Sequence, residues 1–234
     1  MSLSRFAALC LLAPALLLGA PADATPARHT PHPAPAAVLH DTERVVMLTD
    51  LGAITLDLDG KHAPITTANF LRYVDGHRFD GIVFYRAMHL AWGEQPNGLI
   101  QGGVQGDPRR VLAPIAHEPT SATGILHKAG TISMARFAPG TATGDFSILL
   151  SDIDGLDAKP EATDPEARAG FAAFGHVVDG MAVVRQIWDL PRSPTAGEGA
   201  LKGQMLEKPV KVISVRRVAL PAVPAPAPAP AGQP

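Results

Sequence analysis

Two short runs near residue 50 are rich in apolar and β-branched side chains. The runs 44–49 and 53–58 flank Asp50-Leu51-Gly52, and every other residue from Ile54 to Leu58 is apolar. A period of two is typical of a strand with one buried face. Because the connection is short and contains glycine, the two runs predict an antiparallel hairpin.

The spacing of apolar residues then changes to that of a helix. Apolar residues recur at helical spacing from Phe70 to Val74, Pro64 suits the first turn, and Gly76 suits the C-terminal cap. A second helix is predicted from Met181 to Asp189 by the same spacing.

The remaining apolar runs are short and are separated by Gly and Pro. Each of them predicts a strand, at residues 82–84, 99–101, 131–134, 146–150, 171–174 and 210–218. Many short strands with only two helices indicate an all-β barrel or sandwich, and the pattern alone does not choose between them.

Length and charge exclude several classes of protein. A chain of 234 residues fits one domain with appendages. The net charge is −2 with both signs evenly mixed, so the sequence shows no basic footprint for nucleic acid or an anionic membrane.

The amino-terminal segment has the pattern of an export signal. A charged start precedes an apolar run at 6–18, and Ala22-Asp23-Ala24 gives a small-x-small cleavage site. An uncleaved membrane anchor is the alternative, but the run is shorter than a span of about 20 residues and contains Pro14. We therefore expect residues 1–24 to be a cleaved signal peptide and the protein to be periplasmic or secreted.

The segments on either side of the foldable part are rich in Pro and Ala. Residues 25–42 and 221–234 favour extended spacers that cannot donate regular backbone hydrogen bonds. The domain is thereby predicted at 43–220. The only cysteine, Cys10, lies within the signal, so we expect a mature protein without disulfides or a thiol nucleophile.

Five short segments follow one another in a fixed order, and each is weak by itself. They are Phe84-Tyr85-Arg86, Gly98-Leu99-Ile100-Gln101-Gly102-Gly103, Ser133-Met134-Ala135-Arg136, Gly144-Asp145-Phe146-Ser147-Ile148 and Phe174-Gly175-His176-Val177. In this order they resemble the cyclophilin-type peptidyl-prolyl isomerases, whose signature runs F-H-R, F-x-x-Q-G-G, S-M-A, S-Q-F-F-I and F-G-x-V. The first helix also fits the A-P-x-T-x-x-N-F pattern of that family.

The resemblance covers roughly residues 43 to 220 and implies both a fold and an activity. The implied fold is a closed eight-stranded antiparallel barrel with an α-helix over each end. The implied activity is cis-trans isomerisation of X–Pro bonds in unfolded or extended polypeptides, without a cofactor. We expect a monomer.

The resemblance also implies two catalytic residues. Arg86 matches the catalytic arginine, and Gln101 matches the glutamine that contacts the substrate backbone. Arginine suits the task because it keeps its proton at neutral pH and holds a rigid fork of donors. The alternatives are an Arg86 whose stem only covers apolar surface and a Gln101 satisfied inside a strand.

Further positions are implied to surround the substrate. Apolar side chains are expected to form the proline pocket, and main-chain groups are expected to hold the peptide. The predicted substrate contacts are Leu99, Ala135, Arg136, Phe146, Phe171 and Trp92.

Several pocket positions depart from the family pattern. Gly98 and Ser147 stand where phenylalanines are expected, and Asp145 replaces a glutamine. Trp92, in the inserted segment 89–97, either folds back to replace one wall or only anchors its loop, and the sequence favours neither. These departures motivate a second reading, a non-catalytic module or chaperone that binds proline peptides.

Other kinds of site have little support. The nine histidines show neither HxH nor HExxH spacing, and Asp152, Asp154 and Asp157 lack the closing glutamate of a calcium loop, so we expect no metal. Spacing leaves a Ser-His-Asp triad open, because triads assemble from distant residues, but no nucleophile-elbow sequence is present.

Overall fold

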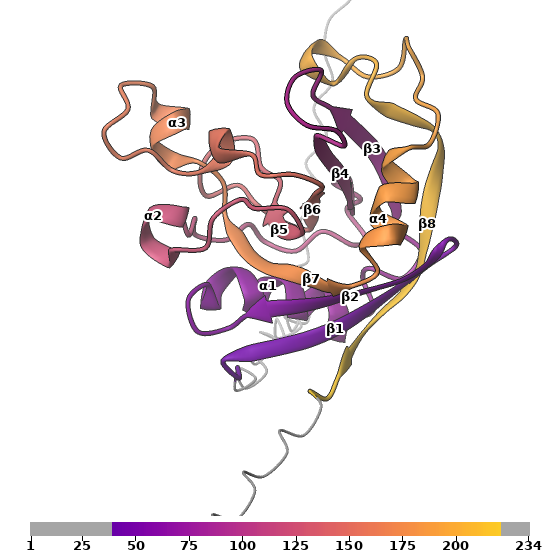
Figure 1. The fold of residues 1–234 in the computed structure, drawn as a ribbon. Coiled ribbons are helices and arrows are strands. Elements are labelled where there is room, and N and C mark those ends of the chain that lie inside the picture. The colour runs from indigo at the N-terminus through magenta and orange to yellow at the C-terminus, as the bar shows by residue number, and fades with distance from the viewer. Residues whose placement is uncertain (1–38, 221–234) are drawn as a thin grey trace, which may run out of the picture. The chain divides into compact units, whose positions relative to one another are not determined.

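The computed structural model describes residues 39–220 (Figure 1). The predicted signal peptide 1–24, the tail 221–234 and most of the linker 25–42 lie outside the described residues. Those three predictions are therefore not addressed by the structure.

Eight strands form one closed barrel, and all neighbouring strands are antiparallel. The order around the barrel is β1-β2-β7-β5-β6-β4-β3-β8. This confirms the all-β barrel and excludes the sandwich. The strands are β1 (Thr42–Thr49), β2 (Gly52–Asp59), β3 (Val83–His89), β4 (Gly98–Gly103), β5 (Thr131–Met134), β6 (Asp145–Leu149), β7 (Ala173–Asp179) and β8 (Met205–Val218).

The two longer helices occur where the apolar spacing predicts them. Helix α1 (Pro64–Asp75) begins with its proline and packs against β8, β2 and β7. Helix α4 (Met181–Trp188) packs against β2, β3 and β4 (Figure 1). The helices therefore cover two different parts of the barrel.

Short helical segments occur in the loops and were not predicted. They are α2 (Thr120–Thr123), α3 (Pro165–Ala169) and two 3-10 turns at Asp154–Leu156 and Gly199–Leu201. Helix α3 begins with Asp-Pro, which is a common sequence at the start of a helix. The Asp164 carboxylate accepts from the N–H groups of Glu166 and Ala167.

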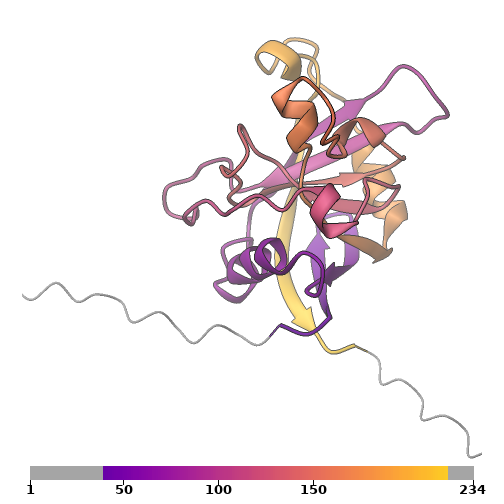
Figure 2. The ribbon, with the colours of Figure 1, turned by 90° about the vertical axis from the view of Figure 1, so that its left-hand side faces the viewer.

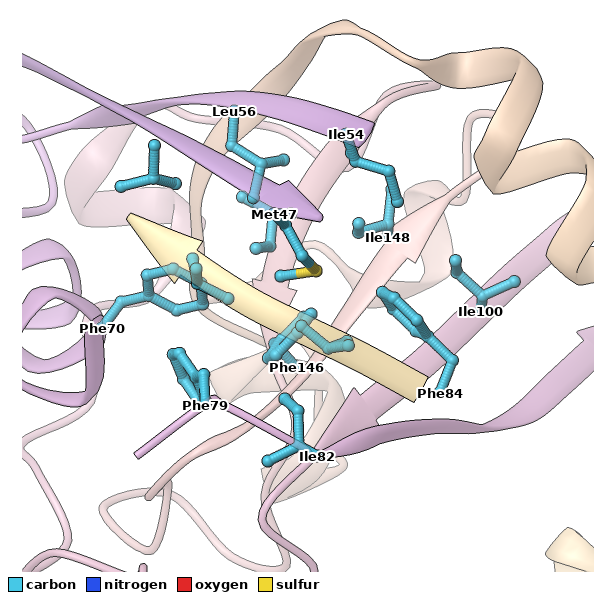
Figure 3. Packing of buried hydrophobic residues seen from close by; sticks show 14 of the residues in the cluster. Met47, Ile54, Leu56, Phe70, Phe79, Ile82, Phe84, Ile100, Phe146 and Ile148 are labelled. Atoms are coloured by element: carbon cyan, nitrogen blue, oxygen red, sulfur yellow. The ribbon is translucent and has the colours of Figure 1, made fainter. Parts of the chain in front are cut away.

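The barrel interior is filled by aromatic and aliphatic side chains (Figure 3). Phe146 lies at its centre, with ring centroids 5.5 Å from Phe70, 5.6 Å from Phe79 and 5.9 Å from Phe84. All four rings are at most 1% exposed. Edge-to-face aromatic pairs at these distances add about 0.5–1.5 kcal/mol each beyond the area that they bury.

Strands β3, β7 and β8 differ most from the predicted ranges, and β3 continues to His89, past the predicted 82–84. The run 171–174 does not begin a strand, because the Phe171 N–H donates to the Leu156 carbonyl in a loop; β7 begins two residues later. Strand β8 begins at Met205, before the predicted 210–218, and its first residue pairs with Arg86. Because polar residues follow Leu206, this part of the strand has no hydrophobic pattern that would predict it.

Candidate active site

A groove of about 660 Å³ lies on the outer side of strands β3, β4, β6 and β5. Loops that carry residues 135–143, Leu156, Phe171 and Leu201 complete its wall. The strands supply the polar centre of the groove, and the loops supply much of its apolar edge.

Four groove residues lie in one row across the sheet. Arg86 of β3 pairs with Gln101 of β4, Gln101 pairs with Ser147 of β6, and Ser147 pairs with Ser133 of β5. Residues directly opposed on antiparallel strands have Cβ atoms about 4.5–5.5 Å apart. The fold therefore brings the two predicted catalytic residues side by side, and two serine side chains continue the row.

A β-bulge at Tyr85 lets β3 contribute two consecutive residues to the groove. The register shifts between Phe84 and Arg86 against both β4 and β8, so Tyr85 is the extra residue. Phe84 and Ala87 are fully buried, whereas Tyr85 and Arg86 both line the groove. Bulges commonly redirect a side chain in this way next to functional sites.

The Arg86 guanidinium is held by two neutral amides. Its Nε and NH2 donate to Oε1 of Gln204 at 2.9 and 2.7 Å, and its NH1 donates to Oε1 of Gln101 at 2.6 Å. Burial lowers the pKa of Arg86 from its very high ordinary value. Among residues 39–220, no carboxylate lies within salt-bridge distance of this guanidinium, so its positive charge is not neutralised by a direct ion pair.

A second set of hydrogen bonds lies behind Gln101. The Gln101 Nε2 donates to the Tyr85 hydroxyl at 2.8 Å, and the hydroxyl donates to Oδ1 of Asp145 at 3.1 Å. Burial raises the pKa of Asp145, and burial together with the Asp145 charge raises the pKa of Tyr85. Removal from water disfavours the charged form of both groups, and the neighbouring carboxylate adds to the effect on Tyr85.

The apolar part of the groove comes from β3, β4 and the loops. Leu99 is 5% exposed and pairs across the strands with Met88, and both line the groove. Met205 lies opposite Arg86 on β8, and Phe171 lines the groove from the loop before β7. Leu99 and Phe171 thus lie where the sequence predicts substrate contacts.

Arg136 lines the groove and also braces its wall. Its side chain is 1% exposed; the guanidinium stacks 4.5 Å from the Phe171 ring centroid and donates to Glu166 at 2.7 Å and to the Gly170 carbonyl at 2.6 Å. Ala135 lines the groove too, but its N–H already donates to the Asp145 carbonyl at 2.9 Å. That N–H is therefore not free to hold a peptide.

Phe146 was expected to contact substrate, and the structure corrects this. Its ring is 0% exposed, lies in the barrel core and does not line the groove. Side chains alternate across a strand, so Phe146 points inward while its neighbours Asp145 and Ser147 point to the groove.

Trp92 was predicted to contact substrate, on the hypothesis that it folds back over the pocket, and this is also wrong. Its side chain is 68% exposed and does not line the groove. It lies in the turn that joins β3 to β4, which Figure 2 shows projecting from the barrel. The turn is held through the Trp92 carbonyl, which accepts from the Asn97 side chain at 2.5 Å.

The backbone conformation explains why residue 98 is glycine, and this position is not part of the pocket wall. Gly98 does not line the groove, its φ is +149°, and a Cβ built there would collide with the Met88 carbonyl oxygen. Ser147, by contrast, does line the groove. Only this second departure removes a ring from the described site.

A buried Ser-His-Asp chain lies beneath the groove. His127 is 0% exposed, with Nδ1 2.7 Å from Oδ1 of Asp157 and Nε2 2.8 Å from Oγ of Ser133. The carboxylate needs a donor, so Nδ1 carries the proton and Nε2 accepts from the serine. Burial lowers the pKa of His127, which favours this neutral form.

This arrangement lacks the main-chain donors that hydrolysis would need beside the serine. The Met134 N–H donates to the Ala172 carbonyl at 3.0 Å, and the Ala135 N–H donates to the Asp145 carbonyl. Neither can serve an oxyanion. The triad therefore ties the groove floor to the Asp157 loop, and the geometry gives no support to a hydrolase.

Sequence reasoning missed Tyr85 and Gln204 as parts of the site. Gln204 is 118 positions from Arg86, and nothing in the short segment before β8 marks it. Tyr85 was visible within the Phe-Tyr-Arg motif, but an alternating pattern would place it opposite Arg86. Only the bulge brings both residues to one face.

Residues 39–220 show neither a metal-binding cluster nor a membrane-spanning helix. No group of three or more His, Cys, Asp or Glu side chains in this part is arranged to hold a metal ion. In the same residues, no helix is long and apolar enough to cross a membrane.

Comparison with known proteins gives a consistent result. The family described as "Cyclophilin type peptidyl-prolyl cis-trans isomerase/CLD" matches residues 44–217. A peptidyl-prolyl cis-trans isomerase of Acinetobacter baylyi is 36% identical over 176 residues, which cover 74% of this chain and 84% of the relative. Peptidyl-prolyl cis-trans isomerase A of Dickeya dadantii is 32% identical, covering 65% and 75%.

Solved structures share the fold at lower identity. A Cryptosporidium parvum cyclophilin-type peptidyl-prolyl cis-trans isomerase superposes with a TM-score of 0.57 at 17% identity, covering 77% of this chain and 99% of the other. The same protein in the presence of the dipeptide Ala-Pro gives a TM-score of 0.58 at 17% identity, covering 76% and 99%.

Proposed function

This chain belongs to the cyclophilin-type peptidyl-prolyl cis-trans isomerases, and from that premise we propose that Arg86 catalyses X–Pro isomerisation in exported polypeptides. The observation that carries the proposal is a guanidinium that lines the groove and that, among residues 39–220, is held by neutral amides without a carboxylate. Gln101, Leu99 and Phe171 would hold the peptide around it.

The proposed mechanism is electrostatic. Rotation about an X–Pro amide faces a barrier of about 18–20 kcal/mol, because resonance gives the C–N bond double-bond character. In the twisted state the proline nitrogen recovers its lone pair and accepts a hydrogen bond. A donor that binds this state more tightly than the planar states lowers the barrier.

Arg86 keeps donors for that task. A guanidinium has five N–H groups. Within the described part of the chain, Gln204 and Gln101 accept from three of them. The remaining two would serve the substrate amide, and no nucleophile or proton transfer is needed.

A protease-coupled assay with an X–Pro peptide tests this function. We expect the mature domain to accelerate cis-trans exchange, with no change on adding a chelator. The rate should be nearly flat between about pH 6 and 8, since an arginine does not titrate there. A protein that binds the peptide but leaves its exchange rate unchanged would support the binding module instead.

The substrates that we propose are proline-containing segments of unfolded or extended chains. An open groove with apolar walls and a polar centre suits such a peptide. The solved relative studied in the presence of Ala-Pro supports this ligand chemistry.

We propose that the protein works after export and assists folding there, which rests on the sequence of residues 1–24. The protein recovered from its host should begin at or near Thr25, as measured by mass spectrometry of the intact chain. A chain that starts at Met1 and stays with the membrane fraction would favour an anchor.

Replacing Ser147 with phenylalanine should strengthen the weakened pocket. Ser147 is 9% exposed and lies beside Gln101 on the groove face. One buried ring is worth about 1.5–3 kcal/mol, so kcat/KM for small X–Pro peptides should rise about tenfold or more. Steady-state assays and melting curves would measure both effects.

Trp92→Ala provides the control for this change. Because Trp92 lies outside the groove, Trp92→Ala should leave the assay unchanged alone and in combination with Ser147→Phe. A Ser147→Phe variant that is destabilised by about 1–3 kcal/mol without faster turnover would show that the site is already full.

A further inference from the structure

The hydrogen bonds behind the proposed catalytic pair run in one direction. Oδ1 and Oδ2 of Asp145 accept from the Gln105 main-chain N–H at 3.1 and 3.2 Å, and Oδ1 also accepts from the Tyr85 hydroxyl at 3.1 Å. Tyr85 in turn accepts from Gln101 Nε2, and Gln101 Oε1 accepts from Arg86 NH1. The chain thus connects a carboxylate to the guanidinium.

The carboxylate sets the direction of this chain. A hydroxyl can donate or accept, whereas a carboxylate can only accept. Because the Tyr85 proton points to Asp145, the Tyr85 oxygen accepts from the Gln101 NH2 group. A planar amide has its oxygen on the opposite side, so Gln101 Oε1 faces Arg86.

A second amide holds the guanidinium from the other side. The Gln204 Nε2 donates to the Ala200 carbonyl at 2.7 Å, which leaves Gln204 Oε1 to accept from Nε and NH2 of Arg86. Because both amides point their oxygen atoms at Arg86, the guanidinium is held by hydrogen bonds on two sides. Pre-set donors of this kind act without reorganisation in the transition state.

Building on the proposed function, we propose that Asp145 and Tyr85 are positioning residues for isomerisation. They orient the Gln101 amide, and through it they fix the Arg86 guanidinium in the groove. Neither side chain is required to touch the reacting amide. The aspartate at 145, which departs from the family pattern, thereby gains a role in this chain.

Alanine at position 145 removes the acceptor that orients this chain. One carboxylate oxygen, Oδ1, accepts from both the Gln105 N–H and the Tyr85 hydroxyl. Without that oxygen the Tyr85 hydroxyl is free to donate to Gln101 Oε1, and the Gln101 NH2 group would then face Arg86, where two donors oppose each other. Asparagine is the conservative variant, because its amide oxygen can take the place of Oδ1 and keep both bonds.

The test is a double-mutant cycle in the X–Pro peptide assay. Asp145→Ala should lower kcat about tenfold with little change in KM, whereas Tyr85→Phe should cost only about two- to threefold. Asp145→Asn should recover most of the alanine loss, because its amide oxygen still accepts from Tyr85. The double variant Asp145→Ala with Tyr85→Phe should return to the level of Tyr85→Phe, because no hydroxyl remains to compete for Gln101 Oε1. Melting curves would show that all four variants are folded.

Two results would overturn the proposal. One is an Asp145→Ala variant with the wild-type kcat, and the other is a double variant at least as impaired as the product of the single losses. The second result would indicate a structural role without orientation. Rescue by removal of a second group is the effect that packing alone does not produce.

Two further measurements separate this proposal from the proposed function. The NMR signals of the Gln101 side-chain amide should shift in Asp145→Ala and return in the double variant, and unchanged signals would contradict the reversal even if the protein proved inactive. In the assay, Arg86→Ala is the reference. If Arg86→Ala has the wild-type rate, the proposed function fails. If Arg86→Ala is impaired but the losses at positions 145 and 85 are additive, only the positioning role fails.

Discussion

Replacing Arg86 with alanine is expected to lower kcat/KM for X–Pro peptides by about a hundredfold or more. Removal of one pre-oriented donor at a developing charge typically costs factors of this size. Peptide affinity should change less than turnover, because the apolar wall of the groove remains. Steady-state and single-turnover assays would separate the two.

The fold of this variant should be retained. Arg86 is outside the core, and its loss should change the free energy of unfolding by about 1 kcal/mol. Arg86→Lys is the matched control, because it keeps the charge but cannot bridge Gln101 and Gln204 with a planar fork. A variant with the wild-type melting temperature and full turnover would show that Arg86 is not the catalyst.

The second large effect is on stability and concerns Phe146. Phe146→Ala should cost about 3–5 kcal/mol in the free energy of unfolding, because it opens a cavity among three other rings. Denaturant titration would measure this loss. Domains are often stable by only about 5–15 kcal/mol, so Phe146→Leu is the milder variant to use if alanine prevents folding.

Ser147→Ala is the matched control for Phe146. It changes the adjacent residue of β6 on the groove face and should alter stability by less than about 1 kcal/mol. If Phe146→Ala kept the native stability and instead weakened peptide binding, Phe146 would belong to the groove and not to the core.

Phe146 also shows how far the sequence can predict this site. Both faces of β6 are covered, one by the core and one by the groove wall, so its residues form a nearly continuous buried run. Such a strand shows no alternation of apolar and polar residues, so its sequence does not show which side chains face inward. The motif therefore located the right strand, but it could not say which side chain faces the groove.

Local signals predicted the regular elements better than the long-range contacts. Pro64 and Gly76 mark the ends of α1, and the alternation from Ile54 predicts β2. Gln204 has no comparable signal, because it reaches Arg86 only when the barrel closes β3 onto β8. Closure of the barrel itself came from the family resemblance, since periodicity left the sandwich open.

The insert before β4 illustrates a different difficulty. Simple counting back from Gln101 placed Gly98 in the pocket and suggested that Trp92 replaces a missing ring. The turn between β3 and β4 instead projects from the barrel (Figure 2), and Trp92 within this turn is exposed. The sequence of an insert shows which side chains it carries, but it does not show where the insert places them.

The bulge at Tyr85 makes the direction of Arg86 independent of the residue before it. Phe84 and Arg86 pair with the consecutive residues Gly102 and Gln101 of β4, so Tyr85 is extra to the register. Deleting Tyr85 would leave Phe84 inward, Arg86 outward and Ala87 inward, which is the regular alternation of a strand. Such a deletion should therefore keep Arg86 beside Gln101 and remove only the hydroxyl that links Gln101 to Asp145.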